Sequence, residues 1–255
     1  MENISNVFYR IFNVFQTPVI GNILLYHRIA NVTDDPHQLS VSTIHFEQHI
    51  RWLTKNTHVI SLSTLIKNLN KNIIQPRSIC LTFDDGYADN YLNALPILRT
   101  YNAPATIFIT AGKVNDTQPF YWDTKTKIHD QGRPLTKKEL KQLHSNFLIE
   151  IGSHSMSHPH LSTISIKKQT EEIKKSKKIL TAMTGKGVTG FSYPFGTTKD
   201  YDKNTVNIVQ ASGYTYACAN FPGNVTSTSR PFMLPRNIIR NWQEDIFIQK
   251  MERLL

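Results

Sequence analysis

The 255-residue chain contains few cysteines and no long hydrophobic run. No stretch approaches the roughly 18 consecutive apolar residues that a membrane-spanning helix needs, which excludes an integral membrane protein. Its two cysteines, Cys80 and Cys218, lie in apolar, strand-like segments, as is typical of reduced, buried thiols in a cytosolic protein. Residues 1–16 lack the basic start, continuous apolar segment and small-residue cleavage site of a secretory signal. We therefore expect a cytoplasmic protein.

Acidic residues are scarce relative to basic ones. The chain has 29 Lys and Arg against 19 Asp and Glu, a formal net charge of +10. Such a charge suits nucleic acid, an anionic membrane surface or an acidic polymer. No recognisable nucleic-acid-reading motif accompanies it, so no nucleic acid is expected as a partner. The 40% of hydrophobic residues excludes an intrinsically disordered chain.

Short β-branched or aromatic segments alternate with helical patterns along the chain, which predicts βα units around a mostly parallel sheet. We expect eight strands, at Asn22–Tyr26, His58–Ser61, Ser78–Phe83, Ala105–Thr110, Leu148–Gly152, Val188–Tyr193, Tyr214–Cys218 and Asn237–Ile239. This many strands in a chain of this length favours an α/β barrel. No linker or composition break divides the chain, so one domain is predicted over residues 22–255.

Two amphipathic helices are predicted between the strands. Thr43–Lys55 places Phe46, Ile50 and Leu53 on one face, and Ser165–Met183 ends at Gly185. The second helix is rich in lysine, which indicates either a solvated outer face or a contact with a polyanion or membrane. These lysines are Lys167, Lys168, Lys174, Lys175, Lys177 and Lys178.

Residues 1–21 form an N-terminal segment with amphipathic character. A helix there would present an apolar face of Phe8, Ile11, Phe12 and Phe15. That face could dock on the barrel or on an anionic membrane, and the sequence leaves both open.

Two adjacent carboxylates, Asp84 and Asp85, follow a buried strand directly and precede Gly86. The carboxyl ends of the strands hold the active site in α/β barrels. Neighbouring side chains on an extended backbone point apart, so one carboxylate can bind a metal while the other acts as a base. The alternative is an ordinary Asp-Gly turn.

A histidine pair, His154 and His158, follows another predicted strand. With Asp85 it forms a three-ligand set suited to zinc or a similar divalent ion, with positions left open for water and substrate. His160 is a spare, expected to be structural or to support the ligands. His45 and His49 have the same spacing but lie in an apolar helical pattern, and we interpret them as structural.

The third candidate element is a strand that runs into a tight turn, Tyr193-Pro194-Phe195-Gly196. Such a turn can aim a backbone N–H at a developing oxyanion, although Pro-x-Gly turns are common. A long irregular stretch, Gly112–Pro134, is expected over the barrel mouth. Within it, Trp122 and its aromatic neighbours could stack on a sugar, and plain packing remains the alternative.

Taken together, Thr82-Phe83-Asp84-Asp85-Gly86-Tyr87, the histidine pair about seventy residues later and Tyr193-Pro194-Phe195-Gly196 resemble the motifs of the polysaccharide deacetylases. This family is also called carbohydrate esterase family 4. The resemblance covers roughly residues 22–240. It implies a deformed (β/α) barrel of about seven parallel strands and a metal-dependent hydrolase that acts on linear amide C–N bonds.

The resemblance also implies roles for single residues. Asp85, His154 and His158 would hold one divalent ion, with Zn²⁺ expected and Co²⁺ or Ni²⁺ as alternatives. Asp84 would be the base, and the backbone N–H of Phe195 would stabilise the oxyanion. Tyr193, Pro194 and Gly196 complete that substrate-binding turn, and Tyr87 and Trp122 are candidates for substrate contacts.

Two departures from the family pattern concern the general acid and the group that orients the base. Many members carry a late histidine as the acid, but no histidine follows His160. His27, at the end of the first strand, is the substitute, as in the exopolysaccharide branch that the chain resembles. The arginine that many relatives carry in the third motif is also missing, and Arg236 is the candidate that orients Asp84.

The sequence therefore predicts removal of N-acetyl groups from an N-acetylhexosamine polysaccharide or a lipid-linked saccharide, with release of acetate. Without a secretory signal, such a substrate would be met inside the cell, with a peripheral contact at the inner face of the membrane. The alternatives are an O-acetyl esterase, an amidase acting on a non-carbohydrate, and a catalytically silent saccharide-binding barrel.

Overall fold

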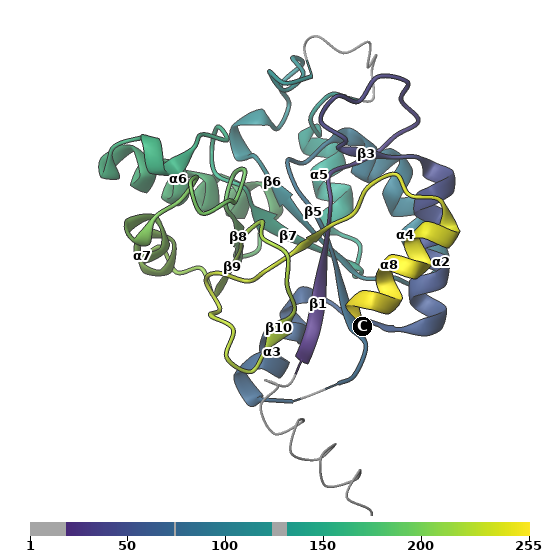
Figure 1. Cartoon of the computed structure of the whole chain (residues 1–255). Coiled ribbons are helices and arrows are strands. Elements are labelled where there is room, and N and C mark those ends of the chain that lie inside the picture. Colours follow the sequence, from purple (N-terminus) through teal and green to yellow (C-terminus); the bar gives the residue numbers. More distant parts are fainter. Residues whose placement is uncertain (1–18, 74, 124–131) are drawn as a thin grey trace, which may run out of the picture.

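The computed structural model describes residues 19–73, 75–123 and 132–255 (Figure 1). The predicted amphipathic helix with Phe8, Ile11, Phe12 and Phe15 lies outside these residues. Residues 19–21, which we had assigned to the N-terminal segment, belong to the first strand.

The centre of the molecule is a curled, mostly parallel sheet with strand order β10-β1-β5-β6-β7-β8-β9. Two further strands pair at its sides, β11 with β1 and β4 with β5. Among the described strands of this sheet, only β10 runs antiparallel to its neighbour. The strands of this sheet are β1 (Val19–Tyr26), β4 (His58–Val59), β5 (Ser78–Phe83), β6 (Ala105–Ile109), β7 (Ile149–Ser153), β8 (Gly190–Ser192), β9 (Tyr216–Cys218), β10 (Val225–Thr226) and β11 (Asn237–Ile238). The predicted deformed (β/α) barrel is confirmed.

One segment near the C-terminus closes the curled sheet. Leu234 forms a parallel bridge with Cys218 at the end of β9. Three residues later, β11 pairs in parallel with β1, where Leu24 faces Asn237. Figure 1 shows this segment in yellow crossing from the side of β9 to β1. Arg236 lies inside this closing segment, between the two pairings.

The helices pack outside the sheet and follow the strands in βα order (Figure 1). They are α2 (Thr43–Asn56), α3 (Leu62–Lys71), α4 (Leu95–Thr100), α5 (Lys137–His144), α6 (Ile166–Thr184), α7 (Lys203–Ala211) and α8 (Glu244–Leu254), with one π turn at Asn90–Ala94 and 3-10 turns at Ala111–Lys113 and Leu161–Thr163. Hydroxyl or carboxylate side chains cap several of them, for example Ser42 on α2 and Ser165 on α6. Gly185 ends α6 in the left-handed conformation, as predicted.

The core lies between the sheet and these helices. Every residue of β5 is buried, as expected for a strand covered on both faces. A second, smaller apolar cluster includes Cys80, Phe108 and Cys218, with Leu62 and Leu65 of α3 packed against it. Cys80 and Cys218 are buried free thiols, as predicted.

All eight predicted strands are present, although several are shorter than expected. The second one, predicted to reach Ser61, ends at Val59 because Ser61 caps α3 instead. Three strands were not predicted: β10 and the small parallel pair β2 (Arg28–Ile29) and β3 (Ser40–Val41). Each spans only two residues, too short to give an alternating pattern.

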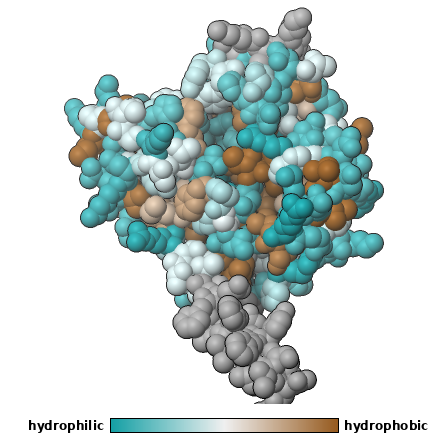
Figure 2. Space-filling model, viewed as in Figure 1, coloured by the Kyte–Doolittle hydropathy of each residue, from teal (hydrophilic) through white to brown (hydrophobic). Residues whose placement is uncertain are grey.

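Hydrophilic and hydrophobic residues are interspersed on the face shown in Figure 2. Within the described part of the chain, no helix combines the length and apolar character required to cross a bilayer.

Candidate active site

Asp84 and Asp85 stand where β5 ends, at the carboxyl edge of the sheet, and both are buried. Asp85 adopts a left-handed conformation with φ of 73°, which turns the chain sharply after Asp84. Gly86 follows at φ of 85°, and a Cβ there would lie 3.0 Å from a methyl carbon of Ile109. The turn thus requires glycine and directs the two carboxylates to different partners.

Asp84 is held by two hydrogen bonds from the fully buried guanidinium of Arg236. Nη1 donates to Oδ1 at 2.8 Å and Nη2 donates to Oδ2 at 2.6 Å. The Ser192 hydroxyl donates to Oδ2 at 3.1 Å. Burial alone would raise the pKa of Asp84, but the nearby Arg236 charge outweighs it and holds the pKa below its ordinary value. Asp84 is therefore an ionised carboxylate with a fixed orientation.

Asp85, His154 and His158 bring three candidate ligand atoms together. The Oδ1 atom of Asp85 lies 3.5 Å from Nε2 of His154 and 3.4 Å from Nε2 of His158. All three side chains are buried, and the ligand atoms lie within 4.8 Å of one another. The carboxylate and the two imidazoles converge on one point.

The protonation states of this cluster suit a divalent cation. Nδ1 of His154 donates to the Ser192 carbonyl at 2.8 Å, which leaves Nε2 as the atom with the free lone pair. Burial lowers the pKa of His154, and burial together with His154 lowers the pKa of His158, so both rings favour the neutral form that binds metals. Burial and the Asp84 charge raise the pKa of Asp85 well above its usual value. A bound cation would stabilise the charged form of the Asp85 carboxylate. The residues therefore fit a divalent metal.

Glu172 of α6 holds the loop that carries the two histidines. Its carboxylate accepts hydrogen bonds from the backbone N–H of Met156 at 2.9 Å and of Ser157 at 2.8 Å, and from the Ser157 hydroxyl. Within the loop, the Ser155 hydroxyl accepts from the His158 N–H at 3.0 Å. Ser155 and His158 have φ values of 64° and 62°, so these contacts hold a backbone that is strained for both residues.

The third turn is also strained and firmly held. Phe195 has a φ of 58°, and Gly196 follows at 68°. Asn220 fixes the turn because its Nδ2 donates to the Phe195 carbonyl at 3.0 Å and its N–H donates to the Gly196 carbonyl at 2.8 Å. The Phe195 ring contacts His158 at a centroid distance of 4.6 Å. This turn therefore lies beside the ligand cluster.

His160 lies next to this turn and does not join the ligand cluster. Its ring stacks on Phe195 at a centroid distance of 3.8 Å, and its Nδ1 bonds Oδ1 of Asp200 at 2.6 Å. These contacts agree with the expected supporting role. Tyr193 is buried and donates from its hydroxyl to the Phe232 carbonyl at 2.9 Å. Its side chain thus anchors the start of the turn to the segment that contains Phe232.

His27 directly follows β1, at the level where Asp84 follows β5, since Tyr26 pairs with Phe83. Its side chain is partly buried. Burial lowers the pKa of His27 to about 4; the charge of Asp84 raises it, and those of Arg236, His154 and Arg240 lower it further. His27 thus shares the rim with the carboxylates and is neutral near pH 7.

The aromatic loop residues lie beside the cluster. The Trp122 ring packs against His158 at a centroid distance of 4.7 Å, and its Nε1 donates to the Tyr87 hydroxyl at 2.7 Å. Tyr87 in turn donates to Oδ2 of Asp123 at 2.6 Å. Tyr87 is fully buried, so it supports Trp122 and Asp123 and is not itself exposed for the substrate contact that we had expected.

His45 and His49 lie apart from this site, on α2. His49 is buried, stacks on Phe247 at a centroid distance of 3.8 Å and donates from Nε2 to the Trp242 carbonyl at 2.8 Å. His45 contacts Asn241 through Nδ1 at 2.6 Å. Both have the structural contacts that their helical pattern predicted.

Comparison with known proteins decides the family. Residues 71–217 match the family model described as polysaccharide deacetylase. The chain belongs to the polysaccharide deacetylase family. The matched range contains the two carboxylates, the histidine pair and the third turn, while His27 and Arg236 lie outside it.

Other polysaccharide deacetylases resemble the chain over most of its length. It is 29% identical over 223 residues to a poly-β-1,6-N-acetyl-D-glucosamine N-deacetylase of Staphylococcus aureus, covering 84% of this chain and 71% of that protein. The solved structure of the Streptococcus pyogenes deacetylase PplD in complex with acetate superposes with a TM-score of 0.76 and 25% identity, covering 92% of this chain and 99% of that one. A de-N-acetylase of Aggregatibacter actinomycetemcomitans shares the fold at 19% identity and a TM-score of 0.75.

Two residues that support the site were given no role from the sequence. Ser192 bonds Asp84, and Glu172 holds the histidine loop. For Glu172 the only signal was its position in the helix that precedes the third motif. For Ser192 it was the end of the strand before the turn.

Proposed function

We propose that the chain removes N-acetyl groups from a polysaccharide that contains N-acetylhexosamine, or from a lipid-linked saccharide, and releases acetate. The observation that carries this proposal is the pairing of an ionised, Arg236-bound Asp84 with the adjacent cluster of Asp85, His154 and His158. A base beside a set of metal ligands is what hydrolysis requires, and a binding module has no use for it. The N-deacetylase activity named for the Staphylococcus aureus relative supports the same reaction.

Asp85, His154 and His158 would hold one divalent ion, with zinc as our first choice and cobalt or nickel as alternatives. The mixed set of two imidazoles and one carboxylate is typical of such ions. When bound, the ion would lower the pKa of a water molecule and polarise the acetamide carbonyl.

The remaining steps fall to the chain's own residues. Asp84 accepts the proton of the attacking water, and Arg236 keeps its carboxylate aimed during the transfer. The Phe195 N–H donates to the oxyanion that forms, in a turn whose strained backbone is fixed before substrate arrives. Among the described residues, none accepts a hydrogen bond from this N–H, so it is available for that role.

His27 would deliver a proton to the departing amine. An amide nitrogen is a very poor leaving group as an anion, so it needs an acid. Because the pKa of His27 is lowered to about 4, it enters the reaction neutral. It must therefore first take up a proton. Asp84 passes on the proton that it accepted from the attacking water, and His27 then delivers that proton to the nitrogen as the C–N bond breaks.

We further propose that the reaction takes place in the cytoplasm, with a peripheral contact at the inner face of the membrane. The net charge of +10 and the exposed lysines of α6 support an attraction to anionic lipids. Binding to vesicles with and without anionic lipid, at low and high salt, tests this contact.

Acetate release tests the proposed activity. The purified, zinc-loaded protein is incubated with oligomers of β-1,6-linked N-acetylglucosamine, and acetate is measured enzymatically. We expect release by the wild type and at least a ~10²-fold slower release by Asp84→Asn. Release from O-acetylated but not from N-acetylated sugars would instead establish an esterase. Saccharide binding without any acetate release would establish a silent binding protein.

A further inference from the structure

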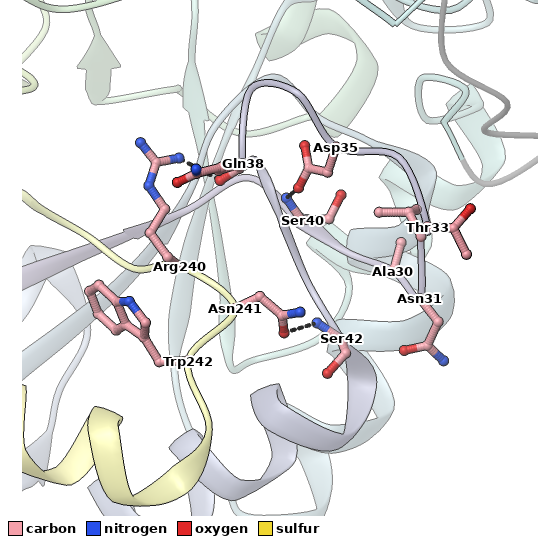
Figure 3. Close-up of a pocket in the computed structure, with 11 residues that line it drawn as sticks. Ala30, Asn31, Thr33, Asp35, Gln38, Ser40, Ser42, Arg240, Asn241 and Trp242 are labelled. Carbon is pink, nitrogen blue, oxygen red and sulfur yellow. Dashed lines mark hydrogen bonds between the residues drawn. The ribbon is translucent and has the colours of Figure 1, made fainter.

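A cavity opens on the rim near the ends of β2 and β11. Its volume is about 570 Å³. The residues that line it come from the segment after β2, from β3 and from the segment before α8: Ala30, Asn31, Val32, Thr33, Asp35, Gln38, Ser40, Ser42, Arg240, Asn241 and Trp242. Figure 3 shows Arg240, Asn241 and Trp242 on one side of the cavity and Asn31, Thr33 and Asp35 on the other. Its volume lies within the usual range for small-molecule sites, roughly 300–1,000 Å³.

The cavity shares the rim with the catalytic carboxylates. Strands β1 and β11 run in parallel, with Leu25 facing Ile238, so His27 and Arg240 follow their strands at the same end. The charges of Asp84 and Arg240 both act on the pKa of His27. The strand register places His27 level with Asp84 after β5 and with Arg240 after β11, so the site and the cavity lie at the same edge of the sheet.

The walls of the cavity are fixed by hydrogen bonds within the protein (Figure 3). Nη1 of Arg240 donates to the Gln38 carbonyl and, at 3.2 Å, to the His37 carbonyl. Asp35 accepts from the Ser40 N–H at 2.7 Å, and Asn241 accepts from the Ser42 N–H at 3.0 Å. A cavity built this way loses little entropy when it binds a ligand.

The groups that remain available suit a sugar ring. Arg240 uses only Nη1 in these contacts with described residues, so Nε and Nη2 are left as donors. Thr33 and Gln38 add a hydroxyl and an amide to the lining. The partly buried Trp242 supplies a flat apolar surface, with Nζ of Lys250 lying 4.6 Å from its ring centroid. A planar aromatic surface beside fixed hydroxyl-binding groups matches the apolar face and the hydroxyls of a pyranose.

We propose that this cavity is a second saccharide subsite, which binds a more distant unit of the polymer being deacetylated, beyond the reach of a dimer bound at the catalytic carboxylates. The lining carries one cation and one carboxylate, Arg240 and Asp35, so a neutral hexosamine unit fits better than a phosphate or an ammonium group. The inference rests on the proposed function, because it assumes a saccharide substrate. The subsite would make the protein prefer longer oligosaccharides to shorter ones.

The test compares steady-state acetate release from a dimer and a hexamer of N-acetylglucosamine by wild type, Trp242→Ala and Trp242→Phe. We expect the wild type to have a lower KM for the hexamer. Trp242→Ala should raise the hexamer KM about tenfold, the equivalent of about 1.4 kcal/mol, and leave kcat and the dimer KM unchanged. Trp242→Phe, which keeps a ring, should recover part of the loss. Lys138→Ala, at an exposed position on α5 and outside the cavity lining, is the control and should behave as wild type.

Two results would overturn the subsite: equal KM changes for dimer and hexamer in Trp242→Ala, or a wild type without length preference. Calorimetric titration of the hexamer separates this failure from failure of the proposed function. A wild type that releases no acetate but binds the hexamer more tightly than Trp242→Ala does would refute the activity and retain the subsite. A wild type that binds no hexamer would refute the subsite itself.

Discussion

The guanidinium of Arg236 donates a hydrogen bond to each carboxylate oxygen of Asp84 in the interior of the barrel, at 2.8 and 2.6 Å. The two residues belong to segments 152 positions apart, and both side chains are buried. Arg236 stands before β11, and its long side chain also donates from Nε to the Ala219 carbonyl. The pair is thus a fixed unit that presents one ionised carboxylate to the rim.

Replacement of Arg236 tests the importance of this geometry. Arg236→Lys keeps the charge but cannot donate two parallel hydrogen bonds, so we expect kcat to fall about tenfold or more with metal content unchanged. Arg236→Met leaves a buried carboxylate without its partner and should destabilise the protein by roughly 3–5 kcal/mol. Activity, metal content and urea unfolding of both variants are the measurements. A fully active Arg236→Lys enzyme would show that a positive charge beside Asp84 is enough for activity and that the two parallel hydrogen bonds are not needed.

We expect substitutions in the two histidine pairs to have opposite effects on metal binding. His154→Ala and His158→Ala should each lose most of the roughly one divalent ion per chain that we expect in the purified protein, because each removes a ligand. His45→Ala and His49→Ala share the spacing but should retain it. Elemental analysis of the four variants measures this directly. Similar losses in both pairs would contradict the assignment.

The two neighbouring aspartates should separate by phenotype. Asp84→Asn is expected to keep the metal and to lower kcat by at least ~10², the lower range for a positioned base. Asp85→Asn should instead weaken metal binding, with activity that partly returns when excess Zn²⁺ is added. Titration of activity against added metal distinguishes them. Exchanged behaviour of the two variants would mean that the roles are reversed.

His27→Ala tests the acid. Metal content and stability should be unaffected, while N-deacetylation should fall by roughly 10² or more. Hydrolysis of an activated aryl acetate should suffer much less, because its phenolate leaves without a proton. The ratio of the two rates in wild type and variant is the readout. A parallel loss of both activities would exclude His27 as the acid.

The buried His49 should make stability depend on pH. Burial lowers its pKa from 6.5 to about 4, so in mildly acidic solution the unfolded chain takes up a proton at this residue that the folded chain excludes. The contribution of neutral His49 to the free energy of unfolding is fully present above pH 6.5. It is lost as the pH falls towards 4, by roughly 3 kcal/mol in total. Urea unfolding of His49→Gln at several pH values should show a shallower loss than wild type. The exposed His58→Gln is the control, and an identical slope in all three proteins would refute the prediction.

The strands and the clustering of the candidate metal ligands could be predicted because their signals are local. Asp84 and Asp85 follow a continuous apolar strand, and His154 and His158 follow another in a polar segment. Parallel strands end at one edge, so their neighbouring residues meet there. A pattern read along the chain thus sufficed for the cluster, for the barrel and for the two amphipathic helices.

The supporting contacts could not be predicted in this way. Ser192 reaches Asp84 over a separation of 108 residues, a distance that no periodicity encodes. The left-handed conformations of Asp85, His158 and Phe195 also lack a local signal, since glycine is the residue that normally marks them. Arg236 entered only as a replacement for an arginine missing from the family pattern, because nothing in Leu234-Pro235-Arg236 shows that its side chain spans the barrel.

The closing segment sets an order of events during synthesis. Asp85, His154 and His158 leave the ribosome well before residue 236, so a nascent chain already carries the three candidate metal ligands while Asp84 still lacks its guanidinium. A domain generally folds as a unit, so the barrel is complete only when this late segment is available. The base becomes ordered only when β11 docks on β1 and seals the barrel. The orientation of Asp84 therefore depends on one of the last segments of the chain to be synthesised, and a chain ending before residue 236 would keep the three candidate ligands and lose the guanidinium that holds the candidate base.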